Sequence, residues 1–225
     1  MEFSFSDIMQ LDMSGGSSEK EEIFVENLRE FLIQQQYFSG AMKKMMTKLE
    51  ILDEEFRVNY DHNPIHHLEY RLKTPKSIIN KLNRYNLPLT LESVWDKLYD
   101  VAGVRVICHY VKDIYLIREL LLRQDDLRLI RERDFIQNPK ANGYRSLHMV
   151  MGIPLYLSRE TAEVPVEIQL RTISMDFWAS LEHEINYKFS EDVSDDIRYR
   201  LKMCAENIYN VEKEMQCIHK EVFKE

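Results

Sequence analysis

EVPVEIQLRT, residues 163–172, alternates in a way that decides the fold of the whole chain. Val166, Ile168 and Leu170 are apolar and share one face of a β-strand, and the polar residues Glu167, Gln169 and Arg171 share the other. Strand-like segments precede it and a tryptophan-containing helical segment follows, which predicts a central strand. A solvated polar face would show the same alternation. On a central strand, however, these polar groups must pair with one another or bind a ligand.

The segments around this strand alternate between strand-like and helix-like patterns. Strands are predicted over residues 67–73, 102–110, 127–135 and 146–157, and helices from Pro75 and over 113–123 and 174–189. Two further amphipathic helices, separated at Ser39-Gly40, are expected before the loop at 59–64. The mixture predicts an α+β fold, a mixed β-sheet flanked by helices. The expected organisation is a flexible leader (1–18), N-terminal helices (19–60), a central domain (61–190) and a C-terminal helix (191–225).

Composition excludes several classes of protein. The formal net charge of −8 over 225 residues argues against broad binding to nucleic acid. No apolar run approaches the roughly 18 residues that a membrane helix needs, and the first residues lack the pattern of a secretory signal. The three cysteines form no CxxC pair, which is typical of reduced thiols in a cytoplasmic protein.

The C-terminal segment carries a heptad pattern. Apolar residues recur at alternating spacings of four and three, at Ile197, Leu201, Cys204, Ile208, Val211, Met215, Ile218 and Val222. Such a stripe is typical of a helix that packs against another helix. Packing on its own domain and an interface between copies of the chain both explain it, and the sequence leaves the two open.

A basic stretch at residues 70–82 is the first candidate binding element. Arg71 and Lys73 lie on one side of the predicted strand, and Ser77 and Lys81 lie one turn apart on the helix that follows. The backbone N–H groups at the start of such a helix favour phosphate. On an acidic protein a local basic patch suggests a compact polyanion such as a nucleotide, although a solvated charged face is the simpler explanation.

Two carboxylates form the second candidate element. Asp100 directly precedes the strand predicted at 102–110, and Arg105 interrupts that strand. Arg105 needs a partner, either an internal carboxylate or a ligand. If Asp100 and Glu167 converge from different strands they can share one hard cation, because Mg²⁺ prefers one or two carboxylates with water and phosphate oxygens.

The loop KANGYRSLH, residues 140–148, is the third candidate element. Gly143 permits a tight turn, so that Tyr144 can stack on a base while Lys140 and Asn142 reach its edge or a phosphate. A tyrosine in a loop also commonly packs against its own domain, and this alternative stays open.

The motifs RLKTPKS, DVAGVRV, NPKANGYRSLH, VEIQLRT and MDFWASLEHEINYK, in this order, closely resemble the synthetase domain of the RelA/SpoT homologues. The resemblance covers roughly residues 40–225 and is strongest to the small, stand-alone alarmone synthetases. It implies a nucleotidyltransferase-like fold. It also implies transfer of the β,γ-pyrophosphate of ATP to the 3′-hydroxyl of GDP or GTP, giving guanosine tetra- or pentaphosphate and AMP. The chain shows no histidine–aspartate hydrolase domain, so synthesis without degradation is expected.

The resemblance also implies roles for particular residues. Asp100 corresponds to the Mg²⁺ ligand, and Glu167 to the second acidic residue, a metal ligand that is also a candidate base toward the 3′-hydroxyl. For ATP it implies that Arg71 and Arg105 sandwich adenine and that the phosphates are held by Lys73, Ser77 and Lys81. Around the acceptor nucleotide it implies stacking on Tyr144 and contacts from Lys140, Asn142, His148, Gln169 and Ala179.

The resemblance further implies a cytoplasmic homotetramer built through the terminal helices. Some relatives bind guanosine pentaphosphate as an activator and some bind single-stranded RNA as an inhibitor, and no motif here decides either point. Three alternatives compete with a synthetase: a nucleotidyltransferase acting on RNA, a non-catalytic module binding guanine nucleotides or RNA, and a metal-binding module built from His62, His66 and His67.

Overall fold

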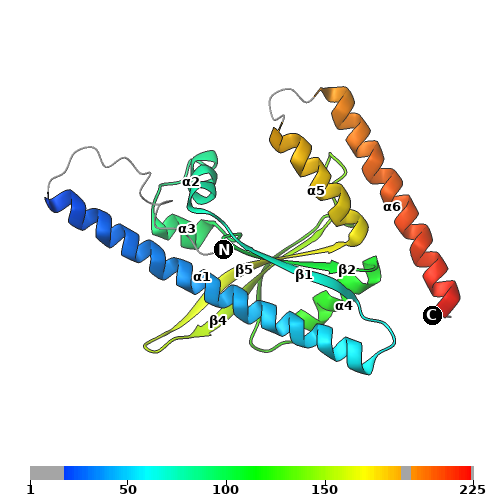
Figure 1. The fold of residues 1–225 in the computed structure, drawn as a ribbon, viewed down its shortest axis with the longest axis horizontal. Coiled ribbons are helices and arrows are strands. Elements are labelled where there is room, and N and C mark those ends of the chain that lie inside the picture. Colours follow the sequence, from blue (N-terminus) through cyan, green and yellow to red (C-terminus); the bar gives the residue numbers. More distant parts are fainter. Residues whose placement is uncertain (1–17, 189–193, 224–225) are drawn as a thin grey trace. The chain divides into compact units, whose positions relative to one another are not determined.

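Helices and strands alternate along the chain. A computed structural model describes residues 18–188 and 194–223. The elements are α1 (Ser18–Asn59), β1 (Ile65–Leu72), α2 (Pro75–Arg84), α3 (Leu91–Lys97), β2 (Ala102–Cys108), α4 (Val111–Leu122), β3 (Arg128–Asp134), β4 (Leu147–Tyr156), β5 (Thr161–Thr172), α5 (Ile173–Lys188) and α6 (Asp195–Phe223) (Figure 1). Every predicted strand is present, with ends within two residues of those expected. The leader expected at 1–18 lies outside the described residues except Ser18, which begins α1.

The five strands form one mixed sheet in the order β1-β2-β5-β4-β3. Strand β2 runs parallel to β5, and the other neighbouring pairs are antiparallel. Strand β5 is central, as predicted: Val166, Ile168 and Leu170 are fully buried on one face, whereas Glu167 and Gln169 on the other are half-buried. The α+β prediction of a mixed sheet flanked by helices is therefore confirmed.

The N-terminal segment is one helix and not the two that were predicted. α1 continues through Ser39-Gly40, although glycine inside a helix costs about 1 kcal/mol relative to alanine. Close packing explains the glycine, because a Cβ on Gly40 would lie only 3.3 Å from Leu155 Cδ1 on β4. The chain divides into two compact units within α1, between Gln36 and Tyr37. All contacts given below belong to the second unit.

A short helix, α3, was not predicted from the sequence. Thr90 caps it by accepting a hydrogen bond from the Ser93 backbone N–H at 3.2 Å. Only Val94 is buried within it, so its apolar pattern is too short to show a period. Within residues 18–188 and 194–223, no helix combines the length and the apolar character of a membrane span.

The C-terminal helix α6 runs back along α5 (Figure 1). The Trp178 indole N–H on α5 donates to the Leu201 carbonyl at 2.9 Å, and Ala205 and Ile208 pack against the same tryptophan. Packing on its own domain therefore explains Leu201 and Ile208 of the heptad pattern, whereas Ile197 and Cys204 in the same half are exposed. In the second half Val211, Met215, Ile218 and Val222 remain exposed.

Candidate active site

Two neighbouring cavities open on the polar face of the sheet, and part of the lining is common to both. The smaller cavity has a volume of about 390 Å³ and the larger about 540 Å³. Both are lined by Asp100, Glu167 and Gln169. Two ligands placed side by side in these cavities would therefore meet at a pair of carboxylates.

Parallel pairing of β2 with β5 brings the two carboxylates together. Gly103 pairs with Glu167, and Asp100 precedes the first residue of β2 by two positions. The two carboxylates are close enough for the charge on Asp100 to raise the pKa of Glu167. The structure therefore brings together the two carboxylates that the sequence suggested as a pair, although Asp100 lies just before its strand.

Asp100 is held by two lysines. Its Oδ2 lies 2.8 Å from Lys73 Nζ at the end of β1 and 2.6 Å from Lys81 Nζ on α2. Burial opposes ionisation of this carboxyl, but the hydrogen bonds from the two lysines outweigh it and lower its pKa. Oδ1 is buried and has no hydrogen-bond partner among the residues that the structure describes. A charged, buried oxygen of this kind can serve as a ligand to a cation.

Glu167 is held by its neighbours on β4 and β5. Its Oε1 lies 3.3 Å from His148 Nδ1, and its Oε2 accepts a hydrogen bond from Gln169 Nε2 at 2.9 Å. Burial raises the pKa of Glu167, but the contacts with His148 and Gln169 outweigh it, so the pKa is lowered overall. Both carboxylates are therefore ionised at neutral pH, which suits a divalent cation.

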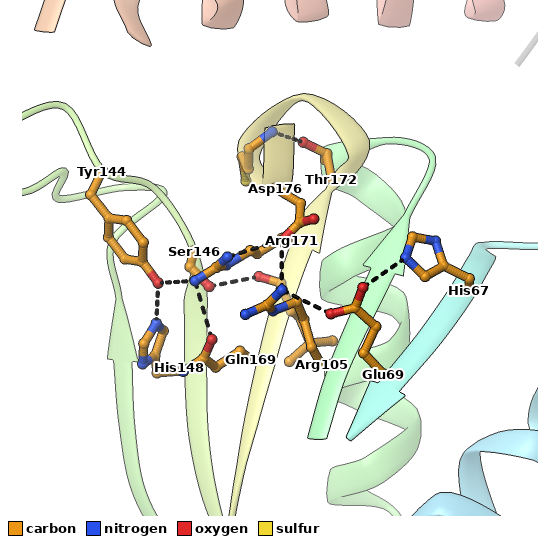
Figure 2. Close-up of polar contacts among 12 residues, drawn as sticks. His67, Glu69, Arg105, Tyr144, Ser146, His148, Gln169, Arg171, Thr172 and Asp176 are labelled. Carbon is orange, nitrogen blue, oxygen red and sulfur yellow. Dashed lines mark hydrogen bonds and ion pairs between the residues drawn. The ribbon is translucent and has the colours of Figure 1, made fainter. Parts of the chain in front are cut away.

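The smaller cavity contains the two arginines expected to sandwich adenine. Arg71 and Arg105 both line it, from the neighbouring strands β1 and β2. Arg105 Nη1 donates to Glu69 Oε2 at 2.8 Å and lies 3.2 Å from Asp176 Oδ1 (Figure 2). The internal carboxylate partner considered for Arg105 is thus present, and its guanidinium still reaches the cavity.

Of the three residues expected at the ATP phosphates, the two lysines lie at the site and the serine does not. Lys73 and Lys81 both contact Asp100, and Lys81 also lines the larger cavity. Ser77 is exposed in the first turn of α2, where it accepts a hydrogen bond from Thr74 Oγ1 at 2.9 Å, and it lines neither cavity. Thr74 itself caps α2, so the backbone N–H groups of this turn remain the feature that favours phosphate.

The residues expected around the acceptor nucleotide lie in two layers. Lys140, His148 and Gln169 line the larger cavity. Tyr144 lies behind them, with Lys140 Nζ 4.5 Å from its ring centroid, so a base can stack on this face of the ring only if Lys140 moves. Burial lowers the pKa of Lys140.

Two of these predicted contacts do not reach the cavity. The Asn142 amide donates to Glu182 Oε1 at 2.9 Å and lines a separate hollow beside α6. Ala179 is buried with Trp178 and Ala205. Helix α6 packs over this part of the loop and of α5, which the sequence pattern could not show.

A polar chain connects Tyr144 to Arg171 on β5, to His148 on β4 and, through Arg171, to Asp176 on α5 (Figure 2). Arg171 Nη2 donates to Tyr144 Oη at 2.8 Å, and Nη1 donates to Asp176 Oδ1 at 3.0 Å. Tyr144 Oη also lies 2.7 Å from His148 Nε2. Because Oη already accepts from Arg171, its own hydrogen is available to His148 Nε2, which assigns the His148 N–H to Nδ1, facing Glu167.

Sequence reasoning missed several residues of the larger cavity. They are aromatic or basic and are Tyr85, Lys97, Tyr99, Arg131 and Arg133. The two arginines lie two positions apart on β3, and this spacing places them on one face of a strand. With Lys81 and Lys140, the lining has five basic side chains against the two carboxylates. The cavity is therefore suited to a polyanion.

The histidines considered as a metal-binding module have other contacts. His62 Nε2 lies 3.0 Å from Asp113 Oδ1, and His66 Nδ1 lies 2.7 Å from His67 Nδ1. In the part of the chain that the structure describes, no group of three or more His, Cys, Asp or Glu side chains is arranged to hold a metal ion.

Comparison with known proteins identifies relatives over most of the chain. Residues 70–192 match the family described as the region found in RelA/SpoT proteins. The GTP pyrophosphokinases YwaC and YjbM of Bacillus subtilis are 42% and 35% identical over 185 residues, which is 82% of this chain and 88% and 86% of theirs. The crystal structure of small alarmone synthetase 2 from B. subtilis superimposes with a TM-score of 0.78 at 39% identity, covering 85% of this chain and 99% of that one. Small alarmone synthetase 1 bound to its product pppGpp superimposes with a TM-score of 0.77 at 34% identity, covering 82% and 94%.

Proposed function

We propose that this chain, which belongs to the RelA/SpoT family, is a GTP pyrophosphokinase of the small alarmone synthetase type. It transfers the β,γ-pyrophosphate of ATP to the 3′-hydroxyl of GDP or GTP, producing guanosine tetra- or pentaphosphate and AMP. One observation supports this most strongly: two cavities, one lined by Arg71 and Arg105 and the other by five basic side chains, meet at Asp100 and Glu167. That arrangement fits two nucleotides whose reacting groups lie side by side.

In this proposal ATP occupies the smaller cavity. Arg71 and Arg105 hold adenine between them. The phosphates are held by Lys73 before α2, by Ser77 in its first turn and by Lys81 in its last turn. Pyrophosphate transfer requires mainly positioning and charge neutralisation, which these cations supply.

The acceptor nucleotide occupies the larger cavity. Lys140, His148 and Gln169 contact it directly, and Tyr144 stacks on guanine once Lys140 moves onto the phosphates. The neighbouring Asn142 and Ala179 shape the loop and the helix behind it. We add Arg131 and Arg133 as candidates for the acceptor phosphates, because both line this cavity.

Chemistry takes place where the cavities meet. The 3′-oxygen of the acceptor forms a bond to the β-phosphorus of ATP. The bond between that phosphorus and the oxygen that bridges it to the α-phosphorus breaks, and the electron pair of this bond leaves with AMP. In this proposal Glu167, which lines both cavities, accepts the hydroxyl proton. Its lowered pKa keeps it ionised but makes it a weak base, so orientation of the hydroxyl is its larger contribution.

Asp100 and Glu167 fit a Mg²⁺ ion. The donor set is two ionised carboxylates, and within the described part of the chain Asp100 Oδ1 is buried without a hydrogen-bond partner. When bound, Mg²⁺ would neutralise charge on the ATP phosphates and orient them.

The proposal extends to assembly and regulation. We propose a cytoplasmic homotetramer, in agreement with three unpaired cysteines and with the exposed apolar residues on the second half of α6. Size-exclusion chromatography with light scattering measures the assembly. Activation by guanosine pentaphosphate and inhibition by single-stranded RNA are each tested by adding them to the synthesis reaction.

The central experiment is a direct assay. Purified protein is incubated with ATP, Mg²⁺ and either GDP or GTP, and the nucleotides are resolved by anion exchange. A more highly charged guanine nucleotide that appears with stoichiometric AMP is expected, and the two yields give the acceptor preference. Binding of guanine nucleotides by folded protein, without AMP even when guanosine pentaphosphate is added, would instead indicate the non-catalytic module.

A further inference from the structure

A buried arginine that none of the expected roles uses joins the two cavities. Arg171, near the end of β5, is 6% exposed, yet it lines neither cavity. Its guanidinium donates in two directions, through Nη1 to Asp176 and through Nη2 to Tyr144 Oη and to Gln169 Oε1 at 3.1 Å. A planar fork of this kind can hold two groups at a fixed separation, which a lysine cannot do.

One branch of this network leads to the smaller cavity. Asp176 Oδ1 accepts from Arg171 at 3.0 Å and also lies 3.2 Å from Arg105 Nη1 (Figure 2). The same carboxylate oxygen is thus shared by two guanidinium groups, of which only Arg105 lines the smaller cavity. Any shift of Arg105 onto a bound base changes the charge that Asp176 presents to Arg171.

The other branch leads to the larger cavity and ends at a carboxylate. Arg171 donates to Tyr144, Tyr144 to His148 Nε2, and His148 Nδ1 faces Glu167 Oε1 at 3.3 Å. Hydrogen bonds aligned in one direction polarise one another in a low-dielectric interior. The position of Arg171 therefore influences both the ring expected to stack on guanine and the orientation of Glu167.

From these contacts we propose that Arg171 is a positioning residue that couples the two nucleotide subsites. The inference rests on the proposed function. When ATP orders Arg105, Asp176 and Arg171 are fixed, and with them Tyr144 and His148. The acceptor then binds to groups that are already ordered, and by reciprocity the acceptor favours ATP binding by the same factor.

Equilibrium binding of GDP, with and without α,β-methylene ATP and Mg²⁺, tests this proposal. In that analogue carbon replaces the bridging oxygen of the bond that breaks, so both nucleotides can bind without turnover. We expect the analogue to tighten GDP binding in the wild type, within the roughly 5- to 150-fold range of typical couplings. In Arg171→Lys the positive charge remains, but one ammonium cannot replace the planar guanidinium that donates in two directions. The affinity for GDP with and without the analogue should then differ by no more than about twofold.

Arg128→Lys is the matched control. Arg128 is also an arginine on a strand that contacts a carboxylate, Glu163, but it lies in neither cavity lining. Its substitution should leave the tightening unchanged. A residue that only stabilised the fold would lower both affinities or the melting temperature without abolishing the ratio between them.

The outcomes separate this proposal from the proposed function. Absence of AMP and alarmone from the wild type would reject the enzyme itself. Active wild type with no tightening, or Arg171→Lys with the full tightening, would overturn the coupling role alone. If Arg171→Lys does not fold, Asp176→Asn removes the shared charge at nearly constant volume and should reduce the tightening. An undiminished ratio in that variant would also overturn the proposal.

Discussion

Substitution of Gly143 by alanine should weaken both the protein and its acceptor subsite, for reasons that the structure separates. Gly143 has φ +92°, and a Cβ there would lie 2.7 Å from Ala205 Cβ on α6. A left-handed backbone costs an L-residue about 1–2 kcal/mol, and an overpacked contact costs about 1–3 kcal/mol. Because the contacting atoms are a methyl group and the adjoining backbone of a packed helix, little relaxation is available. We expect a loss of about 2–5 kcal/mol in the free energy of unfolding.

A double-mutant cycle isolates the steric part of this loss. Ala205→Gly removes the opposing methyl group and should itself cost about 1 kcal/mol, as glycine does inside a helix. Adding Gly143→Ala to this variant should cost about 1–3 kcal/mol less than adding it to the wild type. Denaturant unfolding at fixed protein concentration measures all four proteins.

A matched glycine and a kinetic readout complete the test. Gly40→Ala introduces a methyl group 3.3 Å from the flexible end of Leu155, on a helical backbone, and should cost much less than Gly143→Ala, because Leu155 can shift by a few tenths of an ångström. In the synthesis reaction Gly143→Ala should raise the KM for GDP several-fold and leave the KM for ATP unchanged, because the loop borders only the acceptor subsite. Equal costs of Gly143→Ala in the two backgrounds, or no loss at all, would refute the assigned packing of α6 on this loop.

Three further changes probe the carboxylates and α6. Asp100→Asn should abolish alarmone synthesis, because it removes the charge that pairs with Lys73 and Lys81 and that suits a divalent cation; near-normal AMP release from the folded variant would contradict the assignment. Burial raises the pKa of Glu212, so its ionised form costs stability as pH rises from the unfolded-state pKa through the raised folded-state value. Glu212→Gln should therefore be more stable than wild type in urea unfolding at pH 7, with the advantage lost in acid; an advantage independent of pH would refute this. Met215→Asp places a charge on the exposed apolar stripe and should lower the mass in light scattering, and an unchanged mass would argue against this interface.

The strands were predictable because each carries its own period. Alternation in residues 163–172 places Glu167 and Gln169 on one face whatever the neighbouring strands are, and the structure has them there. The continuity of α1 was not predictable, because Ser39-Gly40 has poor local helix propensity. The glycine at position 40 is explained by its close approach to Leu155, which is far away in sequence. Propensity is a local quantity, whereas close packing against a distant strand is not.

The sequence predicted which residues belong to the site better than it predicted how their side chains are arranged. Motif order identified Asp100 and Glu167, and parallel pairing of β2 with β5 brought them together. The sequence could not show that Asn142 would turn to Glu182 beside α6. Such outcomes depend on how a distant helix packs over a loop. Arg171 was noticed on the polar face of its strand, but its partners depend on three-dimensional contacts alone.

The ion pairs at Asp100 explain how the buried charges of the site are neutralised before substrate binds. A buried carboxylate is costly unless it is paired, and two lysines that are expected on the ATP phosphates pair with it here. In the proposed function ATP brings phosphate charge for Lys73 and Lys81, so both can turn to it while Asp100 becomes available to a cation. Asp100 and the two lysines then have a partner of opposite charge before and after ATP binds, so these groups can be brought together without an energetic penalty large enough to unfold the domain. The same logic explains why these lysines, and not Arg71, contact the carboxylate: an ammonium on a flexible stem can exchange one anionic partner for another, whereas a guanidinium is better suited to stay against a flat ring.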